Sequence, residues 1–357
     1  MKKRAYKGYG AYDYLGSEGI SDIELCNGDN RVAQFLIPLS EKEEDRANKL
    51  AEELIYISVH EHPVLFPEDM VNDGLNYSKT GRQWCDYESL SRSNIDGVFD
   101  NMMDGTSMIF SHGGWKWEEI IFDLGIRLCD IAHQDFVVQC KRVEDIIKAK
   151  KEGQIAFIPA LESSAPIENE LDRIDVLYGL GIRSMGITYS NSNLLGSGGK
   201  EQDDGGLTNF GRRAVERMNK VGMLIDCAHT GSRTALDTIA HSKHPIILSH
   251  VGARALWDST RLFGDDVLKA CASEGGVIGI SAAPHTTITH NNKKHSIYSV
   301  MEHFEYIVNL VGIDHVAFGP DTFYGDHVKF HQAFSGIYTS SLDPNIEKVE
   351  YVKGMEN

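Results

Sequence analysis

The sequence predicts an α/β protein built as a (β/α)₈ barrel of the TIM type with an N-terminal extension. From residue 51 onward, short apolar runs alternate with amphipathic stretches, which is typical of a parallel sheet covered by helices. Eight such runs occur, and eight units favour a closed barrel over an open sheet. The chain of 357 residues also has room for a barrel of about 250 residues and its insertions.

The eight apolar runs are the expected strands. In chain order they are residues 54–60, 107–111, 155–161, 183–189, 223–228, 245–250, 276–282 and 315–319. Helices are expected between them, over residues 143–151, 167–180, 209–221, 232–240, 265–273 and 297–311. Several of these helices end at a glycine, as at Gly181 and Gly222, where a left-handed cap is expected.

Two regions fall outside this alternation. Residues 1–50 are polar and irregular, and we expect them to form an extension that packs against another part of the protein. The barrel domain is then residues 51–357. Residues 63–106 are expected to form a polar, turn-rich insertion. No apolar stretch follows the basic start MKKRAYKG, so no secretory signal is predicted.

Composition and charge exclude several classes of protein. The fractions of hydrophobic (41%) and charged (24%) residues are those of a globular protein. No apolar run reaches the roughly 18 residues of a membrane span. The 35 basic and 52 acidic residues give a net charge of −17, which argues against nucleic acid or a membrane surface as partner. The six cysteines show no C-x-x-C spacing, so we interpret them as reduced and structural in a cytoplasmic protein.

Side chains of the metal-binding type follow the predicted strands, at the end where a barrel carries its chemistry. His60 and His62 flank the end of the first strand, and at positions i and i+2 they can face the barrel axis together. Glu162 and His229 follow the third and fifth strands, and His250 is the last residue of the sixth. Five ligands exceed the need of one tetrahedral ion and suit two ions bridged by a carboxylate, which Glu162 offers.

Other polar residues complete the predicted site. Asp321, after the eighth strand, is placed to act as a general base for a metal-bound water. Arg261, in the loop after the sixth strand, can bind a substrate carboxylate through two hydrogen bonds. Asp226 is interpreted as a capping or orienting residue. Residues 196–199 lack the context of a phosphate loop and are expected to form a flexible loop over the mouth of the barrel.

Four stretches carry a resemblance to a known family: ALESSAPIENELDRIDVLYGLGIRSMGITYSNSN, GLTNFGRRAVERMNKVGMLIDCAHTG, HPIILSHVGARAL and DHVAFGPD. From about residue 54 to about residue 325, the chain resembles the renal (membrane) dipeptidases, metallopeptidases among the amidohydrolase-like barrels. The resemblance implies two zinc ions bridged by Glu162, with His229 and His250 on the second ion. It also implies that Arg261 binds the terminal carboxylate of the substrate and that Asp321 is the catalytic aspartate.

The chain departs from this family pattern in three ways. The family has His-x-Asp where this chain has His60 and His62, which changes the charge of the site by one unit. Tyr189 replaces a histidine that stabilises the oxyanion, and since a tyrosine hydroxyl can donate a hydrogen bond we expect it to assist in that role. About two more helices follow the last strand in the family, so a chain that ends at Asn357 is expected to be C-terminally truncated.

These residues predict a metal-dependent hydrolase that cleaves an amide bond of a small carboxylate-bearing substrate with a metal-bridging hydroxide. A dipeptide is the first expected substrate and an N-acyl amino acid or cyclic amide the second. Zn²⁺ is the expected ion, with Mn²⁺, Fe²⁺ and Co²⁺ left open because His and carboxylate ligands suit them too. A mononuclear amidohydrolase or deaminase and a non-catalytic ligand-binding barrel stay as alternatives. The resemblance makes a homodimer the assembly to test.

Overall fold

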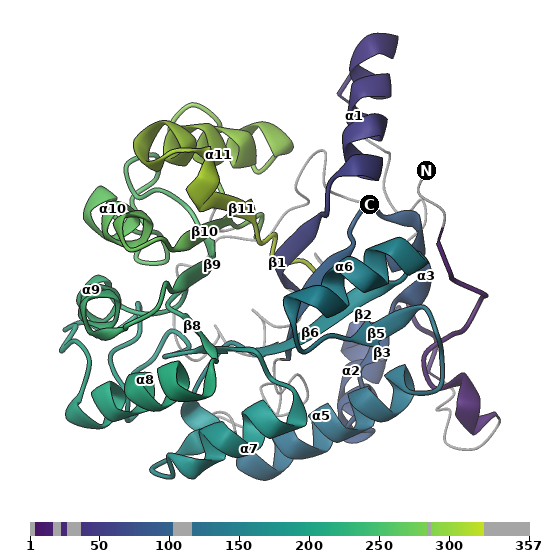
Figure 1. Cartoon of the computed structure of the whole chain (residues 1–357), viewed down its shortest axis with the longest axis horizontal. Coiled ribbons are helices and arrows are strands. Elements are labelled where there is room, and N and C mark those ends of the chain that lie inside the picture. The colour runs from purple at the N-terminus through teal and green to yellow at the C-terminus, as the bar shows by residue number, and fades with distance from the viewer. Residues whose placement is uncertain (1–3, 17–22, 27–36, 103–115, 284–286, 325–357) are drawn as a thin grey trace.

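The computed structural model describes residues 4–16, 23–26, 37–102, 116–283 and 287–324, and they form a parallel barrel surrounded by helices (Figure 1). The sheet follows the strand order β1-β4-β6-β7-β8-β9-β10-β11, and β5 (Val137–Gln139) pairs with β6 beside this path. The strands of the path are β1 (Ile57–Glu61), β4 (Gly97–Met102), β6 (Ile155–Leu161), β7 (Ser184–Gly186), β8 (Leu224–Asp226), β9 (Ile247–Val251), β10 (Val277–Ile280) and β11 (Val316–Phe318).

The two ends of this path meet directly after β1 and β11. The backbone N–H of His62 donates to the carbonyl of Thr322 (3.1 Å), and that of Asp321 donates to the carbonyl of His60 (3.3 Å). A parallel bridge joins His62 to Phe323. The barrel therefore closes at the carboxyl ends of its strands, and the predicted (β/α)₈ fold is confirmed.

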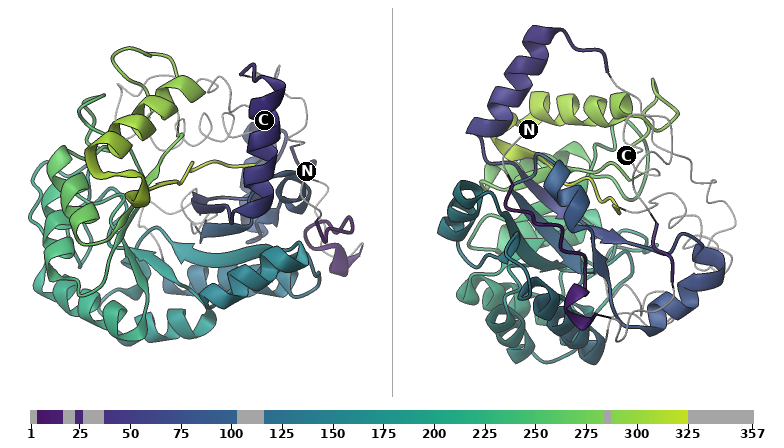
Figure 2. Two further views of the ribbon diagram at one scale, coloured as in Figure 1. Left: turned by 45° about the horizontal axis from the view of Figure 1, so that its top comes forward. Right: turned by 90° about the vertical axis from the view of Figure 1, so that its right-hand side faces the viewer.

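Helices cover the outside of the barrel (Figure 1, Figure 2). They are α5 (Trp117–Ile131), α6 (Val143–Glu152), α7 (Asp172–Leu180), α8 (Asn209–Val221), α9 (Ser232–His241), α10 (Asp265–Ser273) and α11 (Ile297–Val311). Three of them have the bounds that the sequence predicts. The expected helix from residue 167 begins only at Asp172, after a 3₁₀ turn (Ala165–Ile167). The predicted glycine cap is present at Gly222, whose φ of 85° ends α8.

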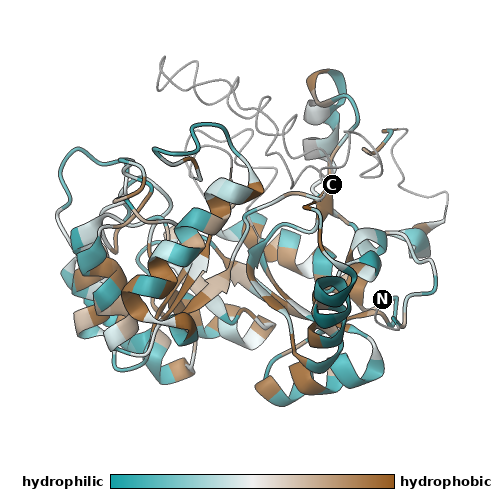
Figure 3. Cartoon of the chain, turned by 90° about the horizontal axis from the view of Figure 1, so that it is seen from above, coloured by the Kyte–Doolittle hydropathy of each residue, from teal (hydrophilic) through white to brown (hydrophobic). Residues whose placement is uncertain are grey.

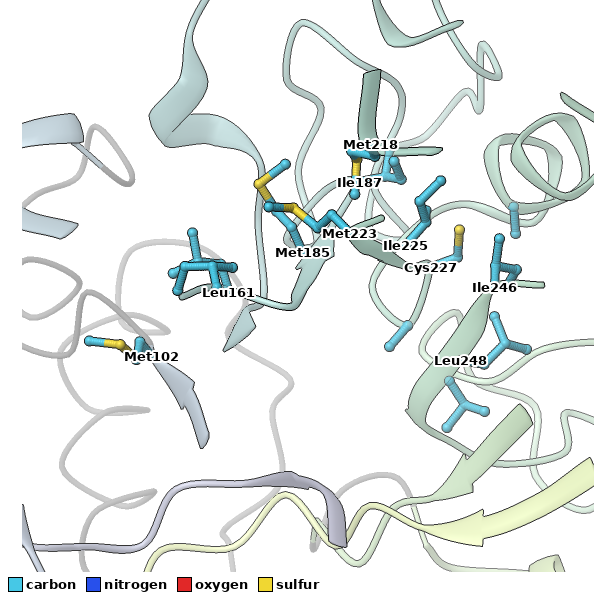
Figure 4. Packing of buried hydrophobic residues seen from close by; sticks show 14 of the residues in the cluster. Met102, Leu161, Met185, Ile187, Met218, Met223, Ile225, Cys227, Ile246 and Leu248 are labelled. Carbon is cyan, nitrogen blue, oxygen red and sulfur yellow. The ribbon is translucent and has the colours of Figure 1, made fainter. Parts of the chain in front are cut away.

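Apolar side chains fill the layer between sheet and helices. Figure 4 shows part of this cluster, in which Met102, Leu161, Met185, Ile225 and Leu248 are almost completely buried. In Figure 3 the helices carry apolar and polar residues on different sides, and the strands between them are mostly apolar. Truncating one such buried side chain to alanine costs about 2–5 kcal/mol, so this layer holds the strand ends in place.

The second strand differs from the prediction. Residues 107–111 lie outside the described residues, and β4 takes the second place in the barrel from within the segment interpreted as an insertion. That segment also holds β2 (Val64–Leu65), α2 (Met70–Lys79), β3 (Trp84–Cys85) and α3 (Tyr87–Arg92). The strand β4 is not recognisable from the sequence because Asp100 and Asn101 interrupt its apolar run. Asp100 is buried beside Arg127, 3.5 Å away, so the strand carries a charge outside the metal site.

The described part of the N-terminal region contains a regular helix that the sequence does not predict. The helix α1 (Glu41–Glu53) begins at a capping box between Ser40 and Glu43 and projects from the barrel (Figure 1). The expected boundary at residue 50 falls inside this helix. Nearer the N-terminus, the Tyr9 hydroxyl and the Tyr12 N–H donate to the carboxylate of Asp130 in α5, at 2.8 and 2.7 Å. This part of the extension therefore packs on the outer helical layer.

Two further expectations concern the chain as a whole. Among the described residues, no helix is both long and apolar enough to cross a membrane. All six cysteines lie within the described residues and are free, and Cys129 alone is exposed. The five buried cysteines therefore act as small apolar side chains, as the sequence predicts.

Candidate metal centre

The five side chains predicted as metal ligands meet at the carboxyl ends of the strands. They come from β1 or the residue after it (His60, His62), from the residue after β6 (Glu162), from the loop after β8 (His229) and from β9 (His250). All five are buried, with exposed fractions of 0–9%. The structure thus brings together residues that lie up to 190 positions apart in the chain, from 60 to 250.

Glu162 lies between two pairs of histidines. Its Oε1 is 3.2 Å from Nε2 of His62 and 3.6 Å from Nε2 of His60. Its Oε2 is 3.1 Å from Nε2 of His229 and 4.0 Å from Nε2 of His250. Oε1 is buried and has no hydrogen-bond partner among the described residues. One oxygen faces each pair, which is how a carboxylate bridges two ions.

The ring nitrogens also converge within each pair. Nε2 of His229 lies 2.9 Å from Nε2 of His250, and Nε2 of His60 lies 3.3 Å from Nε2 of His62. The potential ligand atoms of Glu162, His229 and His250 lie within 4.8 Å of one another. The same holds for His60, His62 and the carboxylate after β11. Nitrogen and carboxylate donors that converge in this way fit two divalent cations.

Asp321 is this additional carboxylate. Its Oδ1 lies 3.3 Å from Nε2 of His62 and 3.4 Å from Nε2 of His60, and its side chain is 19% exposed. Burial lowers the pKa of His62, but Asp321 and Glu162 raise it to about 10. The two carboxylates therefore favour a positive charge at this point, where a cation can take the place of the proton. The structure puts Asp321 within reach of a cation as well as of a substrate.

The charge state of the other pair also suits a metal. Burial raises the pKa of Glu162, but His60 and His229 lower it to well below its usual range. Burial, together with Arg261, lowers the pKa of His229 to about 4. Burial and the neighbouring His60 lower the pKa of His250 as well. An ionised carboxylate and neutral imidazoles are the forms that bind metal ions.

The two residues predicted to contact the substrate lie beside His229. Nη2 of Arg261 is 3.1 Å from Nε2 of His229, and its Nη1 donates to the carbonyl of Ala228. The ring of Tyr189 stacks on the imidazole of His229, with 4.2 Å between ring centroids. Both side chains therefore face the same half of the centre.

The glycine-rich segment lies beside the site and makes backbone hydrogen bonds to it, and its expected flexibility stays a prediction. The N–H of Gly199 donates to the carbonyl of His229 (2.8 Å), and that of Lys200 donates to the carbonyl of Ser190 (2.9 Å). A Cβ on Gly198 would lie 2.1 Å from the carbonyl oxygen of Ser190. The glycine is needed because two backbone segments meet here, which the sequence alone does not reveal.

Sequence reasoning missed two serines that contact the imidazoles from behind. The hydroxyl of Ser190 lies 3.1 Å from Nδ1 of His229, and that of Ser249 lies 2.8 Å from Nδ1 of His250. Neighbouring residues of a regular strand point to opposite faces, so Ser249 is not expected to reach its own neighbour. The register between β9 and β10 shifts here, which breaks that alternation.

Comparison with known sequences gives one family and several relatives. The family model described as membrane dipeptidase, peptidase family M19, matches residues 44–332. An uncharacterized protein in the pqqA 5′ region of Klebsiella pneumoniae is 27% identical over 191 residues, which cover 51% of this chain and 70% of that protein. Dipeptidase tcpJ of Claviceps purpurea is 27% identical over 246 residues, which cover 65% of this chain and 56% of that protein. The chain thus spans little more than half the length of the second relative.

Comparison with solved structures shows the fold. An amidohydrolase from Pseudomonas aeruginosa has a TM-score of 0.67 at 24% identity, with 80% of each chain covered. The probable dipeptidase PvdM of the same organism has a TM-score of 0.66 at 19% identity, covering 80% of this chain and 87% of that one. A metallo peptidase from Rhodobacter sphaeroides, liganded with a phosphinate mimic of the dipeptide L-Ala-D-Ala, has a TM-score of 0.61 at 19% identity, covering 75% and 86%.

Proposed function

Because the chain belongs to the membrane dipeptidase family, peptidase family M19, we propose that it is a metallohydrolase that cleaves the amide bond of a dipeptide with a free C-terminal carboxylate. The observation that supports the proposal most directly is Glu162, with one carboxylate oxygen facing each histidine pair. N-acyl amino acids are the second substrate class, since they offer the same amide and carboxylate.

We assign the residues of the centre to two cation positions. His60, His62 and Oε1 of Glu162 would hold one cation, with Asp321 in reach of it. His229, His250 and Oε2 of Glu162 would hold the other. Zinc is the proposed ion, and Mn²⁺, Fe²⁺ and Co²⁺ suit the same donors. When bound, the two cations lower the pKa of a water molecule toward about 7 and polarise the scissile carbonyl.

Asp321 is the proposed general base. It takes a proton from the attacking water and passes it to the nitrogen of the leaving amine. Although burial raises its pKa, His250 and His60 keep it well below the usual range, so the carboxylate is ionised, which is the form that a general base needs. Its partial exposure leaves room for contact with the substrate.

Arg261 and Tyr189 are the proposed substrate-binding residues. The guanidinium of Arg261 is anchored to the carbonyl of Ala228 and can donate its remaining N–H groups to the substrate carboxylate. The Tyr189 hydroxyl can donate to the carbonyl oxygen as negative charge develops on it. Because both residues lie beside His229, the substrate carboxylate is proposed to lie on that side of the centre.

A one-ion hydrolase or deaminase is the alternative, because His60, His62 and Asp321 form a three-ligand group by themselves. Elemental analysis of protein purified without added metal or chelator separates the two. Two ions per chain, with hydrolysis of dipeptides in a broad screen, is the expected result. One ion per chain and no dipeptide hydrolysis would favour the alternative. The family membership argues against a non-catalytic barrel.

The proposal also includes the location of the protein and its assembly. Six free cysteines fit a reducing compartment, so the cytoplasm is the proposed location. A homodimer stays a prediction from the resemblance, and the division of the chain at residue 50 stays a prediction from composition.

A further inference from the structure

The hydroxyl of Ser249 lies between the two halves of the metal centre, on the side away from the cation positions. Its Oγ is 2.8 Å from Nδ1 of His250 and 3.3 Å from Nδ1 of His60. His60 belongs to the half with His62, and His250 to the half with His229. The rings of His60 and His250 face each other with 3.5 Å between centroids, and Ser249 is 2% exposed. One hydroxyl therefore contacts a ligand of each proposed cation.

Asp226 determines the direction of these hydrogen bonds. Its Oδ1 accepts the backbone N–H groups of Ala228 and Ser249, each at 3.0 Å. Its Oδ2 lies 2.5 Å from Oγ of Ser249 and accepts the hydroxyl proton. A serine hydroxyl has one proton to donate, so towards both imidazoles Oγ acts as an acceptor. The Nδ1 atoms of His60 and His250 therefore carry hydrogen.

Hydrogen on Nδ1 of these two histidines affects both cation positions. An imidazole with hydrogen on Nδ1 has its lone pair on Nε2. The Nε2 atoms are the ones that face Glu162 in both rings. We propose that Ser249 is a positioning residue that fixes the tautomer and the ring orientation of His60 and His250 together, and thereby couples the affinities of the two cation positions. This inference rests on the proposed two-ion centre.

Close approach of the backbone at two glycines places Ser249 next to both rings. A Cβ on Gly319 would lie 1.9 Å from the carbonyl oxygen of Ser249 and 3.1 Å from Cβ of His60. A Cβ on Gly279 would likewise lie 1.9 Å from the same oxygen. Glycine at both positions lets the backbones next to β9 approach closely enough for one serine to reach two rings.

Ser190 provides a matched control. Its hydroxyl lies 3.1 Å from Nδ1 of His229 and it is buried like Ser249. It contacts a ligand of only one half of the centre. Loss of this hydroxyl removes the same chemical group from behind a metal ligand, without touching His60 or His250.

The test is a titration of the metal-free full chain with Zn²⁺ against a competing chelator, for the wild type, S249A and S190A. In S249A both binding steps are expected to weaken by about 10–100-fold, the usual effect of losing an outer hydrogen bond to a ligand. In S190A one step weakens and the other stays within about threefold of the wild type. An S249A chain with one step or neither weakened would overturn the coupling.

The same titration separates this inference from the proposed function. A wild type that binds fewer than two ions would overturn the two-ion centre and the coupling with it. If the wild type binds two ions and S249A binds them equally tightly, the coupling alone is overturned and the two-ion centre stands.

A second measurement avoids the variant, should S249A fail to fold. In the zinc-loaded wild type labelled with ¹⁵N-histidine, His60 and His250 are both expected to show a protonated Nδ1 and a metal-bound Nε2. A metal-bound Nδ1 in either ring would overturn the inference.

Discussion

Nε2 of His229 and Nε2 of His250 lie 2.9 Å apart, closer than the 3.3 Å between Nε2 of His60 and Nε2 of His62. Burial lowers the pKa of both imidazoles, so both rings are neutral and each has a lone pair on one of its two nitrogens. Two lone pairs repel at this distance unless a cation or a proton lies between them. With Oε2 of Glu162 3.1 Å from His229, the arrangement favours a cation that all three residues bind.

Replacing Glu162 with glutamine is expected to reduce the metal content from two ions per chain to about one. An amide has only one oxygen, so it cannot face both histidine pairs as the carboxylate does. Elemental analysis measures the change. Glu61→Gln is the control, because Glu61 is also buried but is tied to the hydroxyls of Ser58 and Thr322. If both variants lose metal equally, the bridging role of Glu162 is wrong.

Replacing Asp321 with asparagine is expected to lower turnover by at least about 10²-fold, because asparagine cannot accept the proton of the attacking water. His60, His62 and Glu162 stay in place, so two ions per chain are expected to remain. Initial rates on a dipeptide and the metal content of the same sample give both results. If the variant also loses one ion, Asp321 acts mainly as a metal ligand. If the variant keeps full activity, Asp321 is not the general base.

The sequence predicts the parts of this protein that depend on local patterns. The strand β6 has the bounds expected from its apolar run, and the ligands could be found because they directly follow such runs. It does not reveal β4, whose Asp100 is buried by pairing with Arg127 from a distant helix. It also misses Ser249, since a contact across the barrel depends on register and on close backbone approach, which no single stretch encodes.

Replacing Arg261 with methionine is expected to lower kcat/KM for dipeptides by about 10–100-fold, since hydrogen bonds to a charged group contribute about 1.5–3 kcal/mol. The effect should disappear for the matching dipeptide amides, which lack the carboxylate. Kinetics on the two substrate series measure the difference. An equal loss on both series would show that Arg261 acts on the metal ligand His229, 3.1 Å away, rather than on the substrate.

The stability of the metal-free protein is expected to fall as the pH decreases from about 6.5 to 4, in part because of His295. Burial lowers the pKa of this histidine to about 4. In that range the unfolded chain binds a proton that the folded chain does not, so acid favours unfolding, with a slope of at most about 1.4 kcal/mol per pH unit. Urea unfolding with chelator present is expected to give a shallower pH dependence for His295→Asn than for the wild type. Identical slopes would contradict this assignment.

Replacing Gly319 with alanine is expected to destabilise the fold by about 1–3 kcal/mol or more, because the added Cβ meets backbone rather than a flexible side chain. The carbonyl of Ser249 would have to move, and with it the hydroxyl behind His60 and His250, so metal affinity should fall too. Gly179→Ala is the matched control. Gly179 lies in α7 with no atom within 4 Å of an added Cβ, so alanine there is expected to stabilise the chain by about 0.5–1 kcal/mol. Urea unfolding of the two variants should therefore shift in opposite directions, and a neutral Gly319→Ala would mean that the barrel does not depend on this close approach.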